Sequence, residues 1–121
     1  MNNDMQNIFG EVIYSYTRKQ AIEDGVLVDV TKQASEAGFK YHTVVTSSVF
    51  EVLNKGDLEG RLWDVLNCAM FAVRSSIGMA KTDTRIEFGV KIGRKNERLL
   101  IDCGPGDQGE PVLTIGYSED F

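Results

Sequence analysis

Apolar and polar residues alternate strictly over positions 85–92, which predicts a β-strand with one buried face. The apolar face carries Ile86, Phe88, Val90 and Ile92. We interpret 93–97 as a hairpin loop, 99–103 as the return strand and 111–117 as a third strand. The last third of the chain is therefore predicted to form a small antiparallel β-meander.

The period of the pattern changes upstream, where apolar residues recur at helical spacing over positions 57–77. One face carries Leu58, Leu62, Val65, Ala69 and Val73, and a neighbouring face carries Trp63, Leu66, Met70 and Ile77. A helix that is apolar on more than one face is buried on more than one side. We therefore expect a long apolar helix that packs on the meander, with a second subunit as the candidate for its other side.

Three shorter helices are predicted before it, each starting at a threonine or serine cap and ending at a glycine. They run over 18–24, 32–37 and 47–54, with caps at Thr17, Thr31 and Thr46 or Ser47 and stops at Gly25, Gly38 and Gly56. Residues 1–7 are expected to be a flexible tail, and 8–16 a strand or an extended docking arm. The whole chain, 1–121, is thus predicted to be one α+β domain.

The composition is typical of one globular domain, since the 121 residues are 42% hydrophobic and 26% charged. No apolar run approaches the roughly 18 residues that span a bilayer, and the N-terminus lacks the basic segment of a signal peptide. The two cysteines, Cys68 and Cys103, are too few for a disulfide scaffold or a zinc site. We expect a cytoplasmic protein without a metal or a cofactor.

The charge of the chain is unevenly distributed. The net charge is −5, which disfavours a polynucleotide as the partner. Residues 74–98 nevertheless carry seven basic and three acidic groups, and the basic ones are Arg74, Lys81, Arg85, Lys91, Arg94, Lys95 and Arg98. Arginine binds phosphate through two parallel hydrogen bonds, and an aromatic ring can stack on a purine. A small anion site completed by a second subunit is one interpretation, and a solvated face of mixed charge is the other.

Two features that suggest an enzyme lack the context that catalysis needs. The segment 104–109 matches G-x-G-x-x-G, but Glu110 and a predicted strand follow it in place of a helix, so we expect a β-turn connection. His42 is the only histidine, and Ser47 or Ser48 would be a nucleophile only if His42 and a carboxylate converged on it. We expect no catalytic residues.

Three segments carry a resemblance to a known family: YSYTRKQAIEDGVLVDV at 14–30, GRLWDVL at 60–66, and CGPGD followed by GEP within 103–111. Together they resemble a family of small proteins carried by bacteriophages and plasmids. The size and layout are similar to those of phage anti-defence proteins that inhibit the Thoeris system. Such proteins are not enzymes, and they sequester the cyclic ADP-ribose isomer that a bacterial TIR-domain sensor produces.

The resemblance implies a homo-oligomer with nucleotide pockets at subunit contacts, built from an aromatic residue, an asparagine and arginines. In this sequence the candidates are Arg61, Phe88, Arg94, Asn96 and Arg98. The implied ligand is a cyclic ADP-ribose isomer or a cyclic oligonucleotide. The alternative is a protein-binding inhibitor or regulator of a mobile element, of the anti-restriction or anti-CRISPR type.

Overall fold

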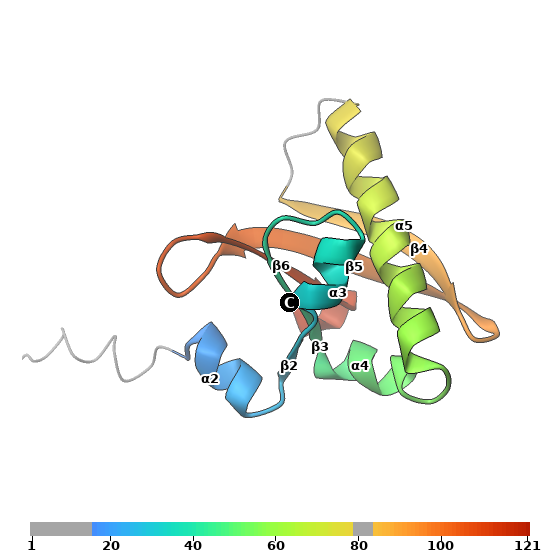
Figure 1. Cartoon of the computed structure of the whole chain (residues 1–121), viewed down its shortest axis with the longest axis horizontal. Helices are drawn as coiled ribbons and strands as arrows, with labels where there is room; N and C mark the ends of the chain where they lie inside the picture. The colour runs from blue at the N-terminus through green and yellow to red at the C-terminus, as the bar shows by residue number, and fades with distance from the viewer. Residues whose placement is uncertain (1–15, 79–83) are drawn as a thin grey trace, which may run out of the picture.

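Strands from both halves of the chain join one five-stranded sheet in the order β2-β3-β6-β5-β4 (Figure 1). The computed structural model describes residues 16–78 and 84–121, so the predictions for 1–7 and 8–15 lie outside it. The helices are α2 (Arg18–Glu23), α3 (Thr31–Glu36), α4 (Ser47–Leu53), α5 (Leu58–Gly78) and the 3-10 helix η1 (Ser118–Asp120). The strands are β2 (Leu27–Asp29), β3 (His42–Thr46), β4 (Arg85–Ile92), β5 (Lys95–Pro105) and β6 (Pro111–Gly116). The α+β prediction is confirmed.

The predicted meander is present as β4, β5 and β6, which pair antiparallel in chain order. The hairpin loop is shorter than predicted, because β4 already ends at Ile92 and β5 begins at Lys95. Gly93, with φ 64°, supplies the left-handed conformation that this tight turn needs. Asn96 therefore lies within a strand and not at the hairpin tip.

The sheet also contains two strands that extend it beyond a meander. β2 pairs antiparallel with β3, and β3 pairs parallel with β6. The predicted antiparallel meander is therefore part of a larger, mostly antiparallel sheet. β3 has no alternating pattern because its central residues, Thr43, Val44 and Val45, are all fully buried.

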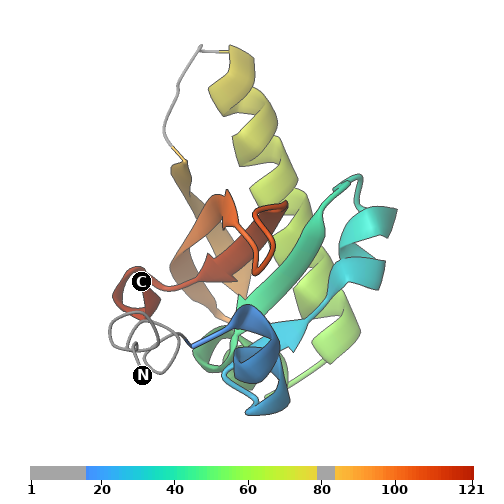
Figure 2. The same cartoon turned by 90° about the vertical axis from the view of Figure 1, so that its left-hand side faces the viewer.

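The main core lies between one face of the sheet, here called the inner face, and the helices α3, α4 and α5 (Figure 2). Its members include Leu66 of α5, Phe88 of β4 and Ile115 of β6. The helix α5 matches the predicted range to within one residue, and its buried residues are on the side that meets the sheet. On its other side Trp63 and Phe71 are exposed among polar residues.

The opposite face of the sheet, here called the outer face, is covered in part by α2. Arg18 of α2 donates from Nη1 to Thr114 Oγ1 at 2.8 Å and from Nη2 to the Leu113 carbonyl oxygen at 2.7 Å. These two residues belong to β6, so α2 is attached to the middle of the sheet. Burial lowers the pKa of the Arg18 guanidinium, and the carboxylates of Asp107 and Glu110 act in the opposite direction.

The glycine-rich segment leads from β5 directly into β6, as the sequence predicts, with 104–105 as the end of β5 and 106–110 as the connection. The Asp107 carboxylate accepts hydrogen bonds from the backbone N–H groups of Arg18 at 2.8 Å and Lys19 at 3.0 Å. These bonds lower the pKa of Asp107. In nucleotide-binding loops a helix N-terminus holds the phosphate of the ligand. Here the N-terminus of α2 holds the Asp107 carboxylate of the glycine-rich loop instead.

Two of the three predicted helix caps are confirmed. Thr17 forms a reciprocal capping box with Gln20 at α2, and the Thr46 side chain accepts from the backbone N–H of Val49 at α4. The prediction for Thr31 is wrong, because the N-cap of α3 is Val30 and it makes no side-chain bond. The backbone N–H and the hydroxyl of Thr31 donate to the carboxylate of Asp29 instead, at 2.9 and 2.6 Å.

The Asp120 carboxylate joins η1 to the end of β3. Its Oδ2 atom accepts from Thr46 Oγ1, from Ser48 Oγ and from the backbone N–H of Tyr117, each at 2.8 Å. Burial acts to raise the pKa of Asp120, but the three hydrogen bonds outweigh it and lower the pKa below its ordinary value.

We predict that Asp120→Asn removes part of the acid sensitivity of the fold. A carboxyl group with a lowered folded-state pKa stabilises the protein above its unfolded-state pKa of about 3.9, and this contribution is lost as the pH falls below that value. Because Asp120 is largely exposed, we expect a loss of only about 1 kcal/mol at neutral pH and a flatter stability curve below about pH 4. Urea unfolding across this pH range measures both effects, with Glu119→Gln as the neighbouring control. If the stability of Asp120→Asn falls below about pH 4 as steeply as that of the unmodified protein, the role given to Asp120 is contradicted.

Candidate functional site

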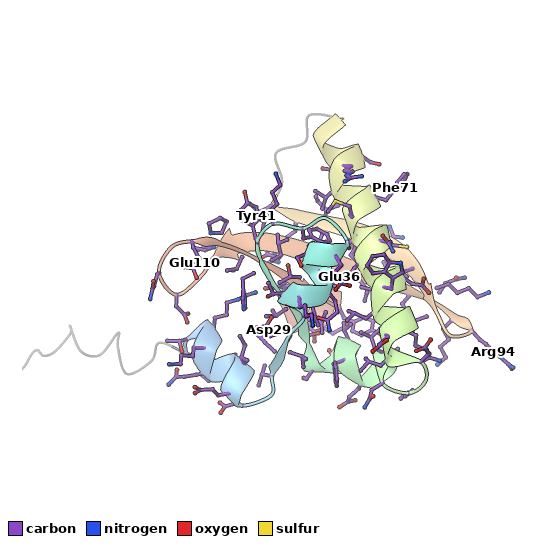
Figure 3. All side chains as sticks on the ribbon, viewed as in Figure 1. Asp29, Glu36, Tyr41, Phe71, Arg94 and Glu110 are labelled. Carbon is purple, nitrogen blue, oxygen red and sulfur yellow. The ribbon has the colours of Figure 1, made fainter. Side chains whose placement is uncertain are left out.

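The five residues predicted to form a ligand site do not line one pocket of a single chain. Phe88 is on the inner face and only 6% exposed. Asn96 and Arg98 lie on the outer face, since they pair with Lys91 and Gly89 on the polar side of β4. Figure 3 shows Arg94 pointing away from the body of the protein at the hairpin turn. The predicted site therefore requires residues from more than one copy, or only some of these five.

Arg61 is held by contacts within the protein. Its Nη1 atom donates to the carbonyl oxygen of Val52 near the end of α4 at 2.8 Å. The guanidinium also occupies the space where two glycines lack a side chain. A Cβ atom added to Gly56 would lie 2.5 Å from Arg61 Nη2, and one added to Gly93 would lie 2.8 Å from it. A cation at a helix C-terminus is electrostatically favourable. Arg61 thus connects the α4–α5 turn to the β4–β5 hairpin.

Arg61 and Arg94 are predicted to differ in their effect on stability. We expect Arg61→Ala to lower the free energy of unfolding by about 1–2 kcal/mol, because the Val52 carbonyl oxygen loses a charged donor. Arg94→Ala is the matched control, and we expect a change within about 0.5 kcal/mol for this exposed turn residue. Denaturant unfolding of both variants tests the difference, and equal stability of the two would contradict the structural role of Arg61.

Basic side chains gather on the exposed part of the outer face formed by β4 and β5, here called the outer strand surface. It consists of Arg85, Glu87, Gly89, Lys91, Asn96, Arg98 and Asp102. Arg85 pairs with Asp102 at 3.1 Å, and Arg98 lies 3.5 Å from Glu87. Among the described residues Lys91 forms no ion pair. A shallow hollow of about 380 Å³ lies at these two strands. Its lining combines outer-face residues with Cys68 of α5 and inner-face positions, and consists of Cys68, Gly89, Val90, Lys91, Asn96, Glu97 and Arg98.

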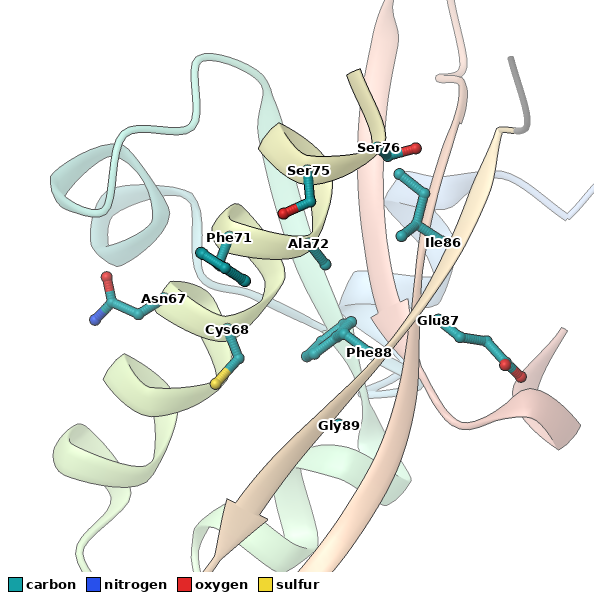
Figure 4. Close-up of a pocket in the computed structure, with 10 residues that line it drawn as sticks. All are labelled: Asn67, Cys68, Phe71, Ala72, Ser75, Ser76, Ile86, Glu87, Phe88 and Gly89. Atoms are coloured by element: carbon teal, nitrogen blue, oxygen red, sulfur yellow. The ribbon is translucent and has the colours of Figure 1, made fainter. Parts of the chain in front are cut away.

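A second candidate surface is a groove of about 490 Å³ between α5 and β4, here called the aromatic groove (Figure 4). It is lined by Asn67, Cys68, Phe71, Ala72, Ser75 and Ser76 of α5 and by residues 86–89 of β4. The Phe88 ring lies in the groove, whereas the Glu87 side chain points away from it (Figure 4). The described lining contains no cation. Phe71 was not predicted as a site residue. It belongs to neither of the two apolar faces predicted for the helix, and an aromatic residue in such a position can indicate a binding surface.

The two aromatic rings of the groove are predicted to have opposite roles. Phe88 is 6% exposed and belongs to the core, so we expect Phe88→Ala to destabilise the fold by about 3–5 kcal/mol. Phe71 is 74% exposed, and Phe71→Ala is expected to change the stability by no more than about 0.5 kcal/mol. Thermal unfolding of the two variants side by side distinguishes them. A large loss for Phe71→Ala would show that this ring is buried by something in solution.

Among the described residues, His42 and Ser48 do not converge in the way a catalytic triad requires. His42 Nε2 lies 3.2 Å from Asp29 Oδ2 at the beginning of β3, whereas Ser48 follows the end of this strand and donates to Asp120. The four residue steps from His42 to Thr46 alone span about 13 Å. Burial and the nearby Asp64 raise the pKa of Cys68, which disfavours the thiolate form that a nucleophile needs.

The described part of the chain contains no group of three or more His, Cys, Asp or Glu residues placed to hold a metal ion. Its helices include none that combines the length and the apolar character needed to cross a membrane. Comparisons with protein-family models, with curated proteins and with solved structures give no match. Membership of the phage and plasmid family therefore stays a prediction from the three sequence motifs.

Proposed function

We propose that the protein binds a small phosphorylated nucleotide at the outer strand surface and the adjoining hairpin, and that it holds this ligand without cleaving it. The observation that carries the proposal is the concentration of cations on β4, β5 and their turn in a chain of net charge −5. Lys91, Arg94 and Arg98 are exposed there, and Asn96 offers an amide that can recognise a base or a ribose. The patch is too short for the phosphates of a long polynucleotide.

We propose a cyclic nucleotide immune signal as the ligand, either a cyclic ADP-ribose isomer or a cyclic oligonucleotide. Support comes from the resemblance of the segments at 14–30, 60–66 and 103–111 to proteins carried by phages and plasmids. The protein would then act as an anti-defence factor of the Thoeris-inhibiting kind in the cytoplasm of an infected bacterium. Residues that bind without reacting are sufficient for this function.

Sequestration acts by mass action, so a useful sponge must bind its ligand below the concentration at which the ligand signals. One shallow surface gives little enclosure, whereas tight small-molecule sites bury most of the ligand. A homo-oligomer that adds a second wall would meet this requirement. We therefore include a second copy of the chain in the proposed binding unit.

A protein-binding inhibitor or regulator of a mobile element is the second candidate. The aromatic groove favours it, because an exposed aromatic ring beside a largely apolar groove is a common anchor for a protein partner. The absence of a cation among the described groove residues also makes this groove a poorer site for phosphate than the outer strand surface.

Titration calorimetry with cyclic ADP-ribose isomers and cyclic dinucleotides tests the proposed function. We expect binding to the unmodified protein, release of intact ligand on heating, and loss of binding in Arg94→Glu or Arg98→Glu. Arg98 is exposed and its single ion pair is long, so its charge reversal should leave the fold intact. Lys32→Glu on α3 is the matched control for a change of net charge.

Each result of this experiment has a defined meaning. A chemically altered ligand would reveal an enzyme and contradict a sponge. Unchanged affinity in Arg94→Glu and Arg98→Glu would remove both arginines from the site. If none of the nucleotides produces a heat of binding, a protein target is favoured. Affinity capture from a host that carries the defence system would then be the next step.

A further inference from the structure

β4 is the terminal strand of the sheet, and within the described residues no strand pairs with its outer edge. It pairs with β5 over eight consecutive residue pairs without a bulge, and it contains no proline. Bulges and prolines are common devices by which proteins keep an edge strand from pairing with another chain. β4 has neither device. Charged side chains are a further device, and those of β4 are of both signs, so its edge is suited to a strand that places opposite charges against them.

The hydrogen-bond pattern between β4 and β5 shows which backbone groups of β4 are left free at its outer edge. The backbone N–H of Cys103 donates to the Thr84 carbonyl oxygen at 2.9 Å, which makes this pair a hydrogen-bonded one. Bonded and non-bonded pairs alternate along an antiparallel ladder. The even-numbered residues of β4 therefore bond to β5, and the odd-numbered residues direct their N–H and C=O groups outward.

We propose that a second copy of this chain pairs antiparallel with β4, about a two-fold axis at Gly89. In this register Glu87 lies opposite the partner's Lys91, and Lys91 lies opposite the partner's Glu87. Both residues are odd-numbered and lie on the outer face. The register that pairs the free backbone groups of the two strands therefore also places opposite charges against each other. The inference does not depend on the proposed ligand.

Charge selects this register over its neighbours. An axis at Phe88 would place Arg85 opposite the partner's Lys91, and an axis at Glu87 would place two Glu87 side chains opposite each other. Like charges directly opposite in a sheet are destabilising. An axis at Gly89 gives two Glu–Lys pairs and brings no side chain to its centre, because glycine has none. Within one chain there is also room for a side chain at this position, since the nearest atom to a Cβ at Gly89 is the Glu97 carbonyl oxygen at 4.0 Å.

The same register is favourable on the inner face. Phe88 would lie beside the partner's Val90, and Ile86 beside the partner's Ile92. The aromatic groove runs along this edge, with Cys68 and Phe71 of α5 on its helix side. The two α5 helices would then lie on the same face of the joined sheet. A continuous ten-stranded sheet is the predicted assembly.

Cysteine crosslinking tests the axis directly in the full chain, with Cys68→Ala and Cys103→Ser as the background. Opposite residues of a hydrogen-bonded antiparallel pair have Cα atoms about 5.5 Å apart, within the range that a disulfide spans. Their Cβ atoms are at the upper limit of that range, so a short bis-thiol crosslinker is used beside oxidation. We expect Gly89→Cys to form a disulfide-linked dimer under mild oxidation. The two copies of Lys91→Cys would be about 14 Å apart and should stay unlinked, so this variant is the matched control.

Charge exchange provides a second, independent test by sedimentation equilibrium. Glu87→Lys alone and Lys91→Glu alone each place like charges across both pairs, and we expect the dimer dissociation constant to rise roughly 2- to 30-fold. The double variant Glu87→Lys/Lys91→Glu restores opposite charges and should recover most of this loss. Thermal unfolding of each variant shows whether the fold itself has changed.

A protein that is monomeric at all concentrations overturns the proposal. A dimer in which Lys91→Cys links as readily as Gly89→Cys, or neither links, also overturns it and assigns the contact to another surface. Association of β4 with a strand of a different protein, while the chain alone stays monomeric, would overturn the self-pairing too. Dimers that link at Gly89 and fail to bind any nucleotide would support this inference and contradict the proposed function.

Discussion

The packing of α5 on the inner face of the sheet is the interaction on which the remaining structure depends. Its buried residues meet the apolar side of β4 and β5, and each fully buried leucine or valine contributes about 1.5–3 kcal/mol. A strand has only two faces, so burying one of them under α5 leaves the charged residues of β4 on the other. The exposure of the basic outer strand surface is a consequence of this single contact.

Much of the fold was predictable because its signals are local. Alternation identified β4, helical spacing identified α5, and a threonine start with a glycine stop identified α2 and α4. β3 was missed because a strand buried on both faces does not alternate, and its parallel pairing with β6 joins segments about 70 residues apart. The cap assigned to Thr31 failed because its hydroxyl is used elsewhere. This hydroxyl donates to the Asp29 carboxylate and accepts from the backbone N–H of Thr43, a contact that joins distant residues and leaves no local signal.

The candidate site was harder to predict, since it depends on contacts between distant segments. The alternating pattern of β4 indicates the face on which Phe88 lies, and in the structure this face packs into the core. The environment of Arg61 does not follow from any local pattern, because Val52 and Gly93 reach it from different elements. Asn96 was placed wrongly because the two-residue turn starts the return strand earlier than the sequence indicates. Only the concentration of cations on one strand pair was visible in advance.

The pairing of β3 with β6 also constrains when the protein can fold during its synthesis. β3 and β2 have only each other as strand partners until residues 111–116 have left the ribosome. α2 must wait as well, since its anchors are Asp107, Leu113 and Thr114. Contacts between segments so far apart slow folding and prolong the exposure of unpaired strands. The first half of this chain is thus expected to emerge as a set of short helices and unpaired strands, and to acquire its sheet only after β6 is made.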